Sequence, residues 1–220
     1  MSFWGETASI PLEPGWRPVR RAAFVKAEGT AFVPVVSHVA AVQTLVAALE
    51  QGRRGVVIHG PAGSGRTVVS RQICRVAGGL VHEQTQPPLD FDGFTSGKHG
   101  IVQDFSGQKR PGFIRVDGLT LEHRGWEALS SGFAVPGVRP VLVATTAWWL
   151  WHRRHFGRGW AEVGLKLLQR DEIEHMANAA RWRLDPRHSQ LGEAAIEEIE
   201  RKSQGLATVV SRLAMAEFIH

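Results

Sequence analysis

Residues 60–67 have the types and the spacing that suit the binding of a polyphosphate. They read Gly-Pro-Ala-Gly-Ser-Gly-Arg-Thr and fit the pattern G-x-x-x-x-G-K-[ST] at every fixed position except one, where Arg66 replaces the lysine. In such a loop the backbone N–H groups and the start of the following helix attract an anion, and the Thr67 hydroxyl is available to Mg²⁺. Arginine is longer than lysine and carries its charge in a planar fork. The loop therefore predicts nucleotide binding with weak or absent turnover. The expected nucleotide contacts are Gly60, Pro61, Ala62, Gly63, Ser64, Gly65, Arg66, Thr67 and Val68.

Asp117 is the candidate for the acid of this site. It follows the apolar residues 113–116, where a nucleotide-binding sheet would place a carboxylate that organises Mg²⁺ together with Thr67. The alternative is that Asp117 caps the turn before Gly118. Because residue 118 is glycine, no adjacent carboxylate is available to activate water, and Glu122 suits a solvated helix start better than the role of a base. The sequence thus predicts a metal-associated acid without a catalytic partner.

Two threonines complete the set of candidate catalytic residues, with Arg66 and Asp117. Thr145 and Thr146 end another apolar stretch, and the hydroxyl of either could orient a phosphate or a water molecule. Ordinary β-propensity explains threonine at these positions almost as well.

Residues 148–160 have the most unusual composition in the chain, because arginine and histidine alternate with aromatic residues. Trp148, Trp149 and Trp151 span one helical turn and cannot all face one core, so at least one should reach a partner, the lid or the N-terminal arm. Cations interleaved with rings suit nucleic acid. They also suit a subunit interface that inserts an arginine into a neighbour's site, and packing against the lid with a solvated basic edge is the third interpretation. The basic and aromatic residues are Trp148, Trp149, Trp151, His152, Arg153, Arg154, His155, Phe156, Arg158 and Trp160.

These residues require a framework of alternating strands and helices. Strands are expected at 56–58, 112–117 and 139–146, with a possible short strand at 80–82 and an edge strand at 160–167. Helices are expected from an N-cap at Ser37 to a stop at Gly52, from Thr67 to about 78, and over 122–133, and only helices follow Asp171. This order predicts an α/β fold, a parallel-sheet P-loop NTPase core with a small C-terminal helical lid. The expected parts are an N-terminal arm (1–35), the nucleotide-binding core (36–168) and the lid (169–220); a disordered tail is the alternative for the arm.

Composition limits the class of protein further. The chain has 220 residues, a formal charge of +5 and 43% hydrophobic residues, and a pI of about 10.1, which suits a polyanionic partner but is also common in basic proteins of other kinds. The single cysteine, Cys74, excludes an internal disulfide framework and is expected to be buried rather than reactive. We expect a cytoplasmic protein without membrane insertion, because no signal peptide is visible and the most apolar segment, 140–151, is too short to span a bilayer.

At this point the sequence resembles the AAA+ P-loop ATPases over about residues 32–220. The resemblance is greatest to the branch with the A-type secretion ATPases and the Mu B and TniB-like transposition regulators. The segments that carry it are 32–38, 60–67, 113–117, 141–146 and 193–207. It implies that Gly60–Thr67 is the phosphate loop, Asp117 the Mg²⁺-associated acid, and Thr145 or Thr146 close to the first sensor position. It also implies that one of Arg153, Arg154 and Arg158 acts in trans.

Four departures from the family pattern all weaken hydrolysis. Arg66 replaces the lysine, Gly118 the catalytic glutamate, and Ala147 a frequent asparagine. The arginine of the lid sensor would fall at Thr208, and the nearest arginine is Arg212, one turn later. The resemblance with these departures implies an ATPase of reduced or absent activity.

The leading hypothesis is a nucleotide-binding AAA+-like regulatory ATPase with weak or absent hydrolysis. It would bind ATP and Mg²⁺, assemble as a homo-oligomer and act on a protein partner or on DNA. The alternative is a catalytically dead adaptor, in which Arg66 fills the phosphate site or pairs with Asp117. A small-molecule kinase is disfavoured by the helical lid and by the lack of an evident acceptor pocket.

Overall fold

The computed structural model describes residues 32–78, 80–84, 112–123, 138–184 and 190–216. Most of the expected N-terminal arm and of the helix expected at 122–133 lies outside these residues. Glu122 is described and lies in a turn, so the expectation that a helix begins at this residue is wrong.

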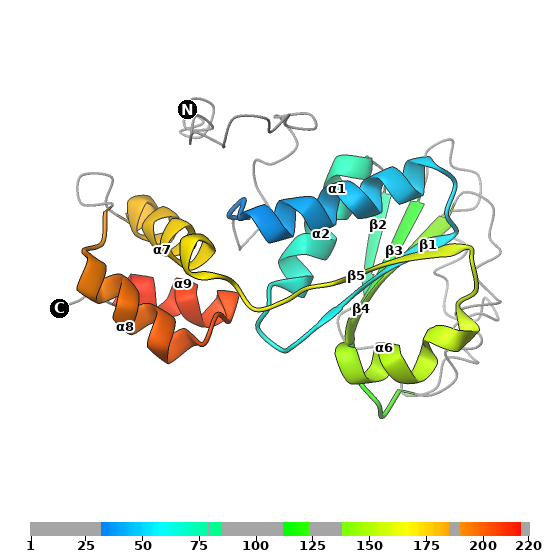
Figure 1. Ribbon diagram of the computed structural model, residues 1–220. Helices are drawn as coiled ribbons and strands as arrows, with labels where there is room; N and C mark the ends of the chain where they lie inside the picture. The colour runs from blue at the N-terminus through cyan, green and yellow to red at the C-terminus, as the bar shows by residue number, and fades with distance from the viewer. Residues whose placement is uncertain (1–31, 79, 85–111, 124–137, 185–189, 217–220) are drawn as a thin grey trace.

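The centre of the fold is a parallel sheet of five strands in the order β2-β3-β4-β1-β5 (Figure 1). The strands are β1 (Gly55–Gly60), β2 (Leu80–Gln84), β3 (Gly112–Leu119), β4 (Val138–Thr145) and β5 (Trp160–Gly164). Parallel strands buried on both faces read as continuous apolar runs, which explains why the runs at 56–58 and 113–116 are uninterrupted. The expected α/β parallel-sheet fold is confirmed, and the short strand at 80–82 and the edge strand after Trp160 are both present. The edge strand ends at Gly164 rather than 167, and β4 ends at Thr145 rather than 146.

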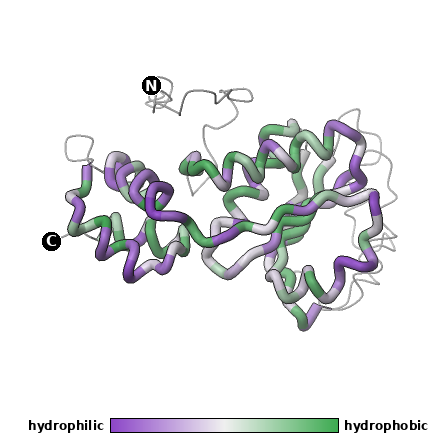
Figure 2. The backbone as a smooth tube through the Cα atoms, in the orientation of Figure 1, coloured by the Kyte–Doolittle hydropathy of each residue, from purple (hydrophilic) through white to green (hydrophobic). Residues whose placement is uncertain are grey.

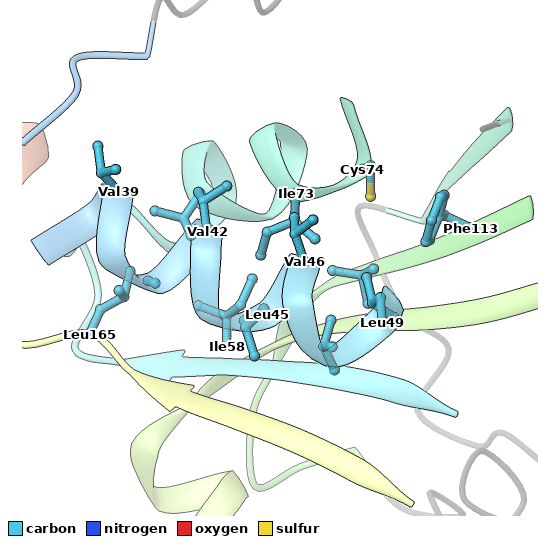
Figure 3. Packing of buried hydrophobic residues seen from close by; sticks show 14 of the residues in the cluster. Val39, Val42, Leu45, Val46, Leu49, Ile58, Ile73, Cys74, Phe113 and Leu165 are labelled. Atoms are coloured by element: carbon cyan, nitrogen blue, oxygen red, sulfur yellow. The ribbon is translucent and has the colours of Figure 1, made fainter. Parts of the chain in front are cut away.

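Helices cover both faces of the sheet. Helices α1 (Val36–Glu50) and α2 (Arg66–Ala77) lie on one face, and α6 (Thr146–His152) with the short 3-10 helix η2 (Arg153–His155) lies on the other (Figure 1). Residues of β1 alternate between these faces: Val56 and Ile58 pack with α1 and α2, whereas Val57 packs with α6. Figure 3 shows the first of the two cores, in which α1 presents a row of aliphatic side chains to the sheet.

The expected N-cap at Ser37 is wrong. Helix α1 begins at Val36, its N-cap is Val35, and no side chain caps it. The free N–H of Ser37 instead donates to Glu172 Oε1 over 2.7 Å, from a different part of the chain. A tertiary partner thus satisfies the helix start, and a local sequence rule cannot see such a partner.

The C-terminal part consists of three helices, α7 (Arg170–Leu184), α8 (Glu193–Ser203) and α9 (Ala207–Ala216). They bury a core of their own, which includes Ile173, Ile196 and Val210. In Figure 2 the sheet strands are mostly green, whereas the outer sides of these helices carry much purple, as expected for amphipathic helices around a small core. Among the described residues, no helix has the length and the apolar character needed to cross a membrane.

Candidate nucleotide-binding site

The loop between β1 and α2 has the backbone conformation that a phosphate-binding loop needs. It leaves β1 at Gly60 and enters α2 at Arg66. Gly63 and Gly65 have φ angles of 83° and 90°, in the left-handed region where glycine is strongly favoured. A Cβ at Gly65 would lie 2.6 Å from Cε1 of His38. Both the conformation and the crowding therefore require glycine at position 65.

The remaining loop residues lie as the motif predicts along this turn. Pro61 and Ala62 are exposed, and the N–H of Ser64 donates to the Pro61 carbonyl over 3.2 Å. The Ser64 hydroxyl is buried, and the described residues provide no partner for it. Thr67 is half-buried in the first turn of α2, and Val68 packs against the core. The Ser64 hydroxyl is therefore a buried polar group of the loop without a described hydrogen-bond partner.

His38 of α1 contacts the backbone of the loop. Its Nε2 lies 2.9 Å from the Ser64 carbonyl oxygen, so the ring donates to this carbonyl when Nε2 carries the proton. Burial lowers the pKa of His38, while the bond to Ser64 and the charge of Glu172 act in the opposite direction. The pattern analysis missed His38 as a site residue, because it lies on a helix 26 residues before its partner.

Arg66 turns its guanidinium toward the sheet. Its Nη1 donates to the carbonyl of Ala144, near the end of β4. Burial lowers the pKa of Arg66, and the negative charge of Asp117 partly offsets this effect. No hydrogen bond joins Arg66 and Asp117 among the described residues, although the charge of Asp117 acts on Arg66. The expectation that Arg66 fills the phosphate site stays a prediction.

Asp117 has a different and unexpected partner, Arg115. Nη1 of Arg115 donates to Asp117 Oδ2 over 2.8 Å, and its Nη2 lies 2.7 Å from Glu83 Oε2 on β2. The Arg115 side chain is fully buried, and its Nη1 also lies 3.3 Å from the Ser70 hydroxyl of α2. Sequence reasoning missed Arg115, although residues two apart on a strand share a face and an arginine amid apolar residues was a visible signal.

A local irregularity of β3 sets the direction of Asp117. The pairing with β4 is Val116 with Leu142 and then Leu119 with Ala144, so one extra residue of β3 is accommodated between them. Gly118 within this bulge has a φ of 84°. Bulges redirect side chains next to functional sites, and this one lies beside the strand end to which Arg66 bonds.

The two candidate threonines also lie at this edge of the sheet. Thr145 is opposite Gly60 in the β1–β4 pairing, so it lies beside the start of the phosphate loop. Its Oγ1 accepts from the N–H of Trp148 over 3.2 Å and caps α6. Thr146 is the first residue of α6 and is half-buried. The cap occupies one lone pair of Thr145 but leaves its hydroxyl proton free to orient a ligand.

The lid contacts the phosphate loop directly through Thr208. Its backbone N–H donates to the Gly63 carbonyl over 3.0 Å, and its hydroxyl lies 3.4 Å from the same oxygen. Thr208 occupies the position at which the family resemblance implies a sensor arginine, and Arg212 is exposed one turn later. The first turn of α9 thus contacts the loop through Thr208, at the position where an arginine was expected.

The arrangement fits a polyphosphate better than it fits a metal ion. The loop presents backbone N–H groups at the start of α2 with Arg66 beside them, and both favour an anion. Thr67 and Asp117 supply the hydroxyl and the carboxylate that a nucleotide-bound Mg²⁺ would use. However, Arg115 already neutralises Asp117, and the described residues contain no group of three or more His, Cys, Asp or Glu side chains that could hold a metal ion. A bound Mg²⁺ would therefore depend mainly on the phosphates.

Three further arginines predicted to act at the site lie elsewhere in the same chain. Arg153 and Arg154 belong to η2, and Arg158 precedes β5. All three are exposed. Trp160 at the start of β5 pairs with Gly55, whereas the phosphate loop follows Gly60 at the other end of β1. No hydrogen bond or ion pair is described between these three arginines and the phosphate loop, and a role in a neighbouring copy stays a prediction.

No family model matches the sequence, and no curated protein matches it. Solved structures do match the fold. Two variants of RuvB from Thermotoga maritima each have a TM-score of 0.60 and 20% identity, over 84% and 90% of this chain and 62% and 64% of the RuvB chains. A third variant has a TM-score of 0.57 and 20% identity, over 80% and 60%. The chain thus spans less than two thirds of the length of these RuvB chains. The predicted secretion or transposition branch is not confirmed by these neighbours, and the matched part of the chain has the AAA+ P-loop NTPase fold.

Proposed function

We propose that this protein binds ATP at the loop Gly60–Thr67 and acts as an AAA+-like regulatory ATPase with weak or absent hydrolysis. Nucleotide binding would control its assembly with further copies and its action on a DNA or protein partner. The observation that carries the proposal is the loop itself, in which left-handed Gly63 and Gly65 lead into the start of α2. RuvB is a structural neighbour of this chain, and the loop lies at the carboxyl end of β1, an inner strand of the parallel sheet.

Two features of the site support slow turnover. Nη1 of Arg66 donates to the Ala144 carbonyl, so this group is already engaged within the chain. Asp117 is followed by Gly118 and is paired with Arg115, so the described site offers no free carboxylate beside it to activate water. When bound, Mg²⁺ would supply charge neutralisation between the phosphates, held by Thr67 and Asp117.

Thermal unfolding with and without ATP, in Mg²⁺ and in EDTA, tests nucleotide binding. A ligand that binds only the folded state at a hundredfold excess over its Kd adds about 2.7 kcal/mol, which is a rise in Tm of about 5–11 °C for a domain of this size. We expect this rise for the wild type and for Arg71→Lys, a control arginine one turn after Arg66 on the same helix. We expect Arg66→Lys to bind at least as well and to hydrolyse ATP faster, because a compact ammonium can enter the loop. If ATP raises the Tm of none of the three proteins, the proposal is refuted.

A catalytically dead adaptor is the second candidate function. Two hydrogen bonds favour it, from Arg66 to the Ala144 carbonyl and from the Thr208 N–H to the Gly63 carbonyl. Both are contacts within the chain at the place that a nucleotide would use. This candidate predicts that the wild type shows no shift with ATP. A shift in Arg66→Lys alone would mean that the arginine has closed the site.

A further inference from the structure

The helix α6, the 3-10 helix η2 and the turn that follows form a surface with a composition found nowhere else in the described chain. Trp151 is 66% exposed and Leu150 is 55% exposed, which is unusual for side chains of this size. Arg153, Arg154 and Arg158 follow directly and are exposed. We call the surface formed by Trp151 and these three arginines the arginine–tryptophan surface.

Two more arginines extend this surface from the start of β1. Nη1 of Arg53 donates to the Arg158 carbonyl. The N–H of Arg54 donates to the Gly159 carbonyl over 2.7 Å, and the Arg54 side chain passes close to Gly159. These bonds join two segments a hundred residues apart in the chain into one surface, and Figure 2 shows the tube after α6 as mostly purple.

No carboxylate among the described residues neutralises the charge of this surface. Four other arginines of the described residues, Arg71, Arg115, Arg170 and Arg201, pair with carboxylates. For Arg53, Arg54, Arg153, Arg154 and Arg158, no described carboxylate lies within ion-pair distance. Glu50 and Glu162 are the exposed acids of the adjoining segments, and Glu162 lies 4.0 Å from His59 instead. Five guanidinium groups therefore share a surface that attracts an anion.

The base of the surface is rigid. Trp148 and Trp149 of α6 are buried, and the Phe156 ring packs at 5.8 Å and 5.2 Å from their centroids. Trp160 meets Phe156 edge-on at 4.8 Å. This aromatic cluster fixes α6 and η2 against the sheet, so Trp151 and the arginines project from a support whose ordering entropy is already lost on folding. The cluster thus accounts for the burial of Trp148 and Trp149, whereas Trp151 stays exposed.

We propose that the arginine–tryptophan surface binds single-stranded nucleic acid, with the guanidinium groups on successive phosphates and the Trp151 ring stacked on a base. A phosphate backbone suits a group of exposed cations that have no described carboxylate partner, although Nε of Arg154 donates to His155 Nε2. An exposed ring can stack on any unpaired base. A single strand is favoured over a duplex because the exposed ring needs an unstacked base face. This inference rests on the proposed function only in naming the class of its partner. It does not depend on ATP binding, since Arg53, Arg54 and Arg158 lie at the opposite end of β1 from the phosphate loop.

The test is fluorescence anisotropy of a labelled 20-nucleotide thymidine oligomer with the full chain at several salt concentrations. Arg153→Gln/Arg154→Gln removes two phosphate contacts and is expected to reduce the slope of log K against log[salt] by about 1.4. Trp151→Ala is expected to weaken binding about 5- to 150-fold without changing this slope. The matched control is Arg201→Gln/Lys202→Gln on the lid, which removes the same charge from an exposed helix where both cations pair with Glu198.

Several results would overturn the inference. One is that the lid control weakens binding as much as the surface variant, which would indicate net charge alone. Another is that Trp151→Ala has no effect, or that a duplex or a polyglutamate peptide binds as tightly as the single strand. A third is that the arginine variant changes the oligomeric state but not nucleic-acid affinity, which would make the surface a contact between copies.

ATP binding is measured on the same samples by thermal shift. An intact shift in the arginine variant separates the two sites. Oligonucleotide binding without any ATP shift in the wild type would refute the nucleotide proposal and leave this one standing.

Discussion

The buried guanidinium of Arg115 gives the strongest test of how this site is built. Its side chain is fully buried, and it joins Asp117 at 2.8 Å, Glu83 at 2.7 Å and Ser70 at 3.3 Å. Replacing it with methionine keeps most of the volume but leaves Asp117 without its cation and Glu83 with only Arg71, at 3.6 Å. Breaking a buried ion pair in this way costs about 3–5 kcal/mol.

The lower end of that range applies, because water can reach both carboxylates. The Glu83 side chain is 39% exposed and the Asp117 side chain 15% exposed. We therefore expect Arg115→Met to lower the free energy of unfolding by about 3 kcal/mol, which is a fall in Tm of roughly 6–12 °C for a domain of this size. Urea unfolding at pH 7.5 measures it.

The control for this experiment is Arg71→Met, in the same ion-pair cluster. Arg71 is 31% exposed and lies 3.6 Å from Glu83, so its loss is expected to cost no more than about 1 kcal/mol. The double variant Arg115→Met/Asp117→Asn should recover part of the lost stability, because the uncompensated acid is gone. If Arg115→Met is as stable as the wild type, or no less stable than Arg71→Met, the assigned role of this ion pair is wrong.

Three further predictions concern the loop and its neighbours. Gly65→Ala should lower the free energy of unfolding by about 1–3 kcal/mol in urea, because its φ is 90° and a Cβ would meet the His38 ring. The control is Gly78→Ala, which also has a positive φ but no neighbour within 4 Å, and it should cost less. Burial lowers the pKa of His38 below its ordinary value of 6.5, so the unfolded state binds more protons than the folded state. The free energy of unfolding should therefore fall as the pH drops below 6.5. Urea denaturation at pH 7.5 and 5.5 should show a smaller difference for His38→Gln than for the wild type. Burial raises the pKa of Cys74 to about 12, so a thiol reagent at pH 8 should label it only after unfolding, and rapid labelling of the folded protein would contradict this.

The positions of strands and helices were predictable, and the reason is local. The apolar run at 56–58, the glycine-rich turn and the helical spacing after Thr67 each encode their own element, and the structure confirms them. The burial of Cys74 was also predictable from its neighbours in α2. Three tryptophans within one helical turn cannot all face one core, and Trp151 is the one that is exposed. The contact expected for it, with a partner, the lid or the N-terminal arm, stays a prediction.

The partners of the site residues could not be predicted, because they depend on strand order and on distant segments. Arg115 reaches Glu83 only because β2 lies beside β3 in the sheet. Nothing in the sequence fixes that order. The bond of Thr208 to Gly63 spans 145 residues, and the motif alone marked Thr208 only as a missing arginine. The sequence thus predicted which groups are present at the site but not which of them neutralise one another.

Those internal contacts share one physical consequence. Arg66 donates to the Ala144 carbonyl, Arg115 holds Asp117, and Thr208 holds the Gly63 carbonyl. Each is a contact that an arriving nucleotide would have to match or replace, so each lowers the net free energy of binding while stabilising the nucleotide-free fold. We expect the protein's response to ATP to appear first in the seat of the lid on the loop, since the bonds from Thr208 to Gly63 are neutral and the ones at Arg115 are charged and buried.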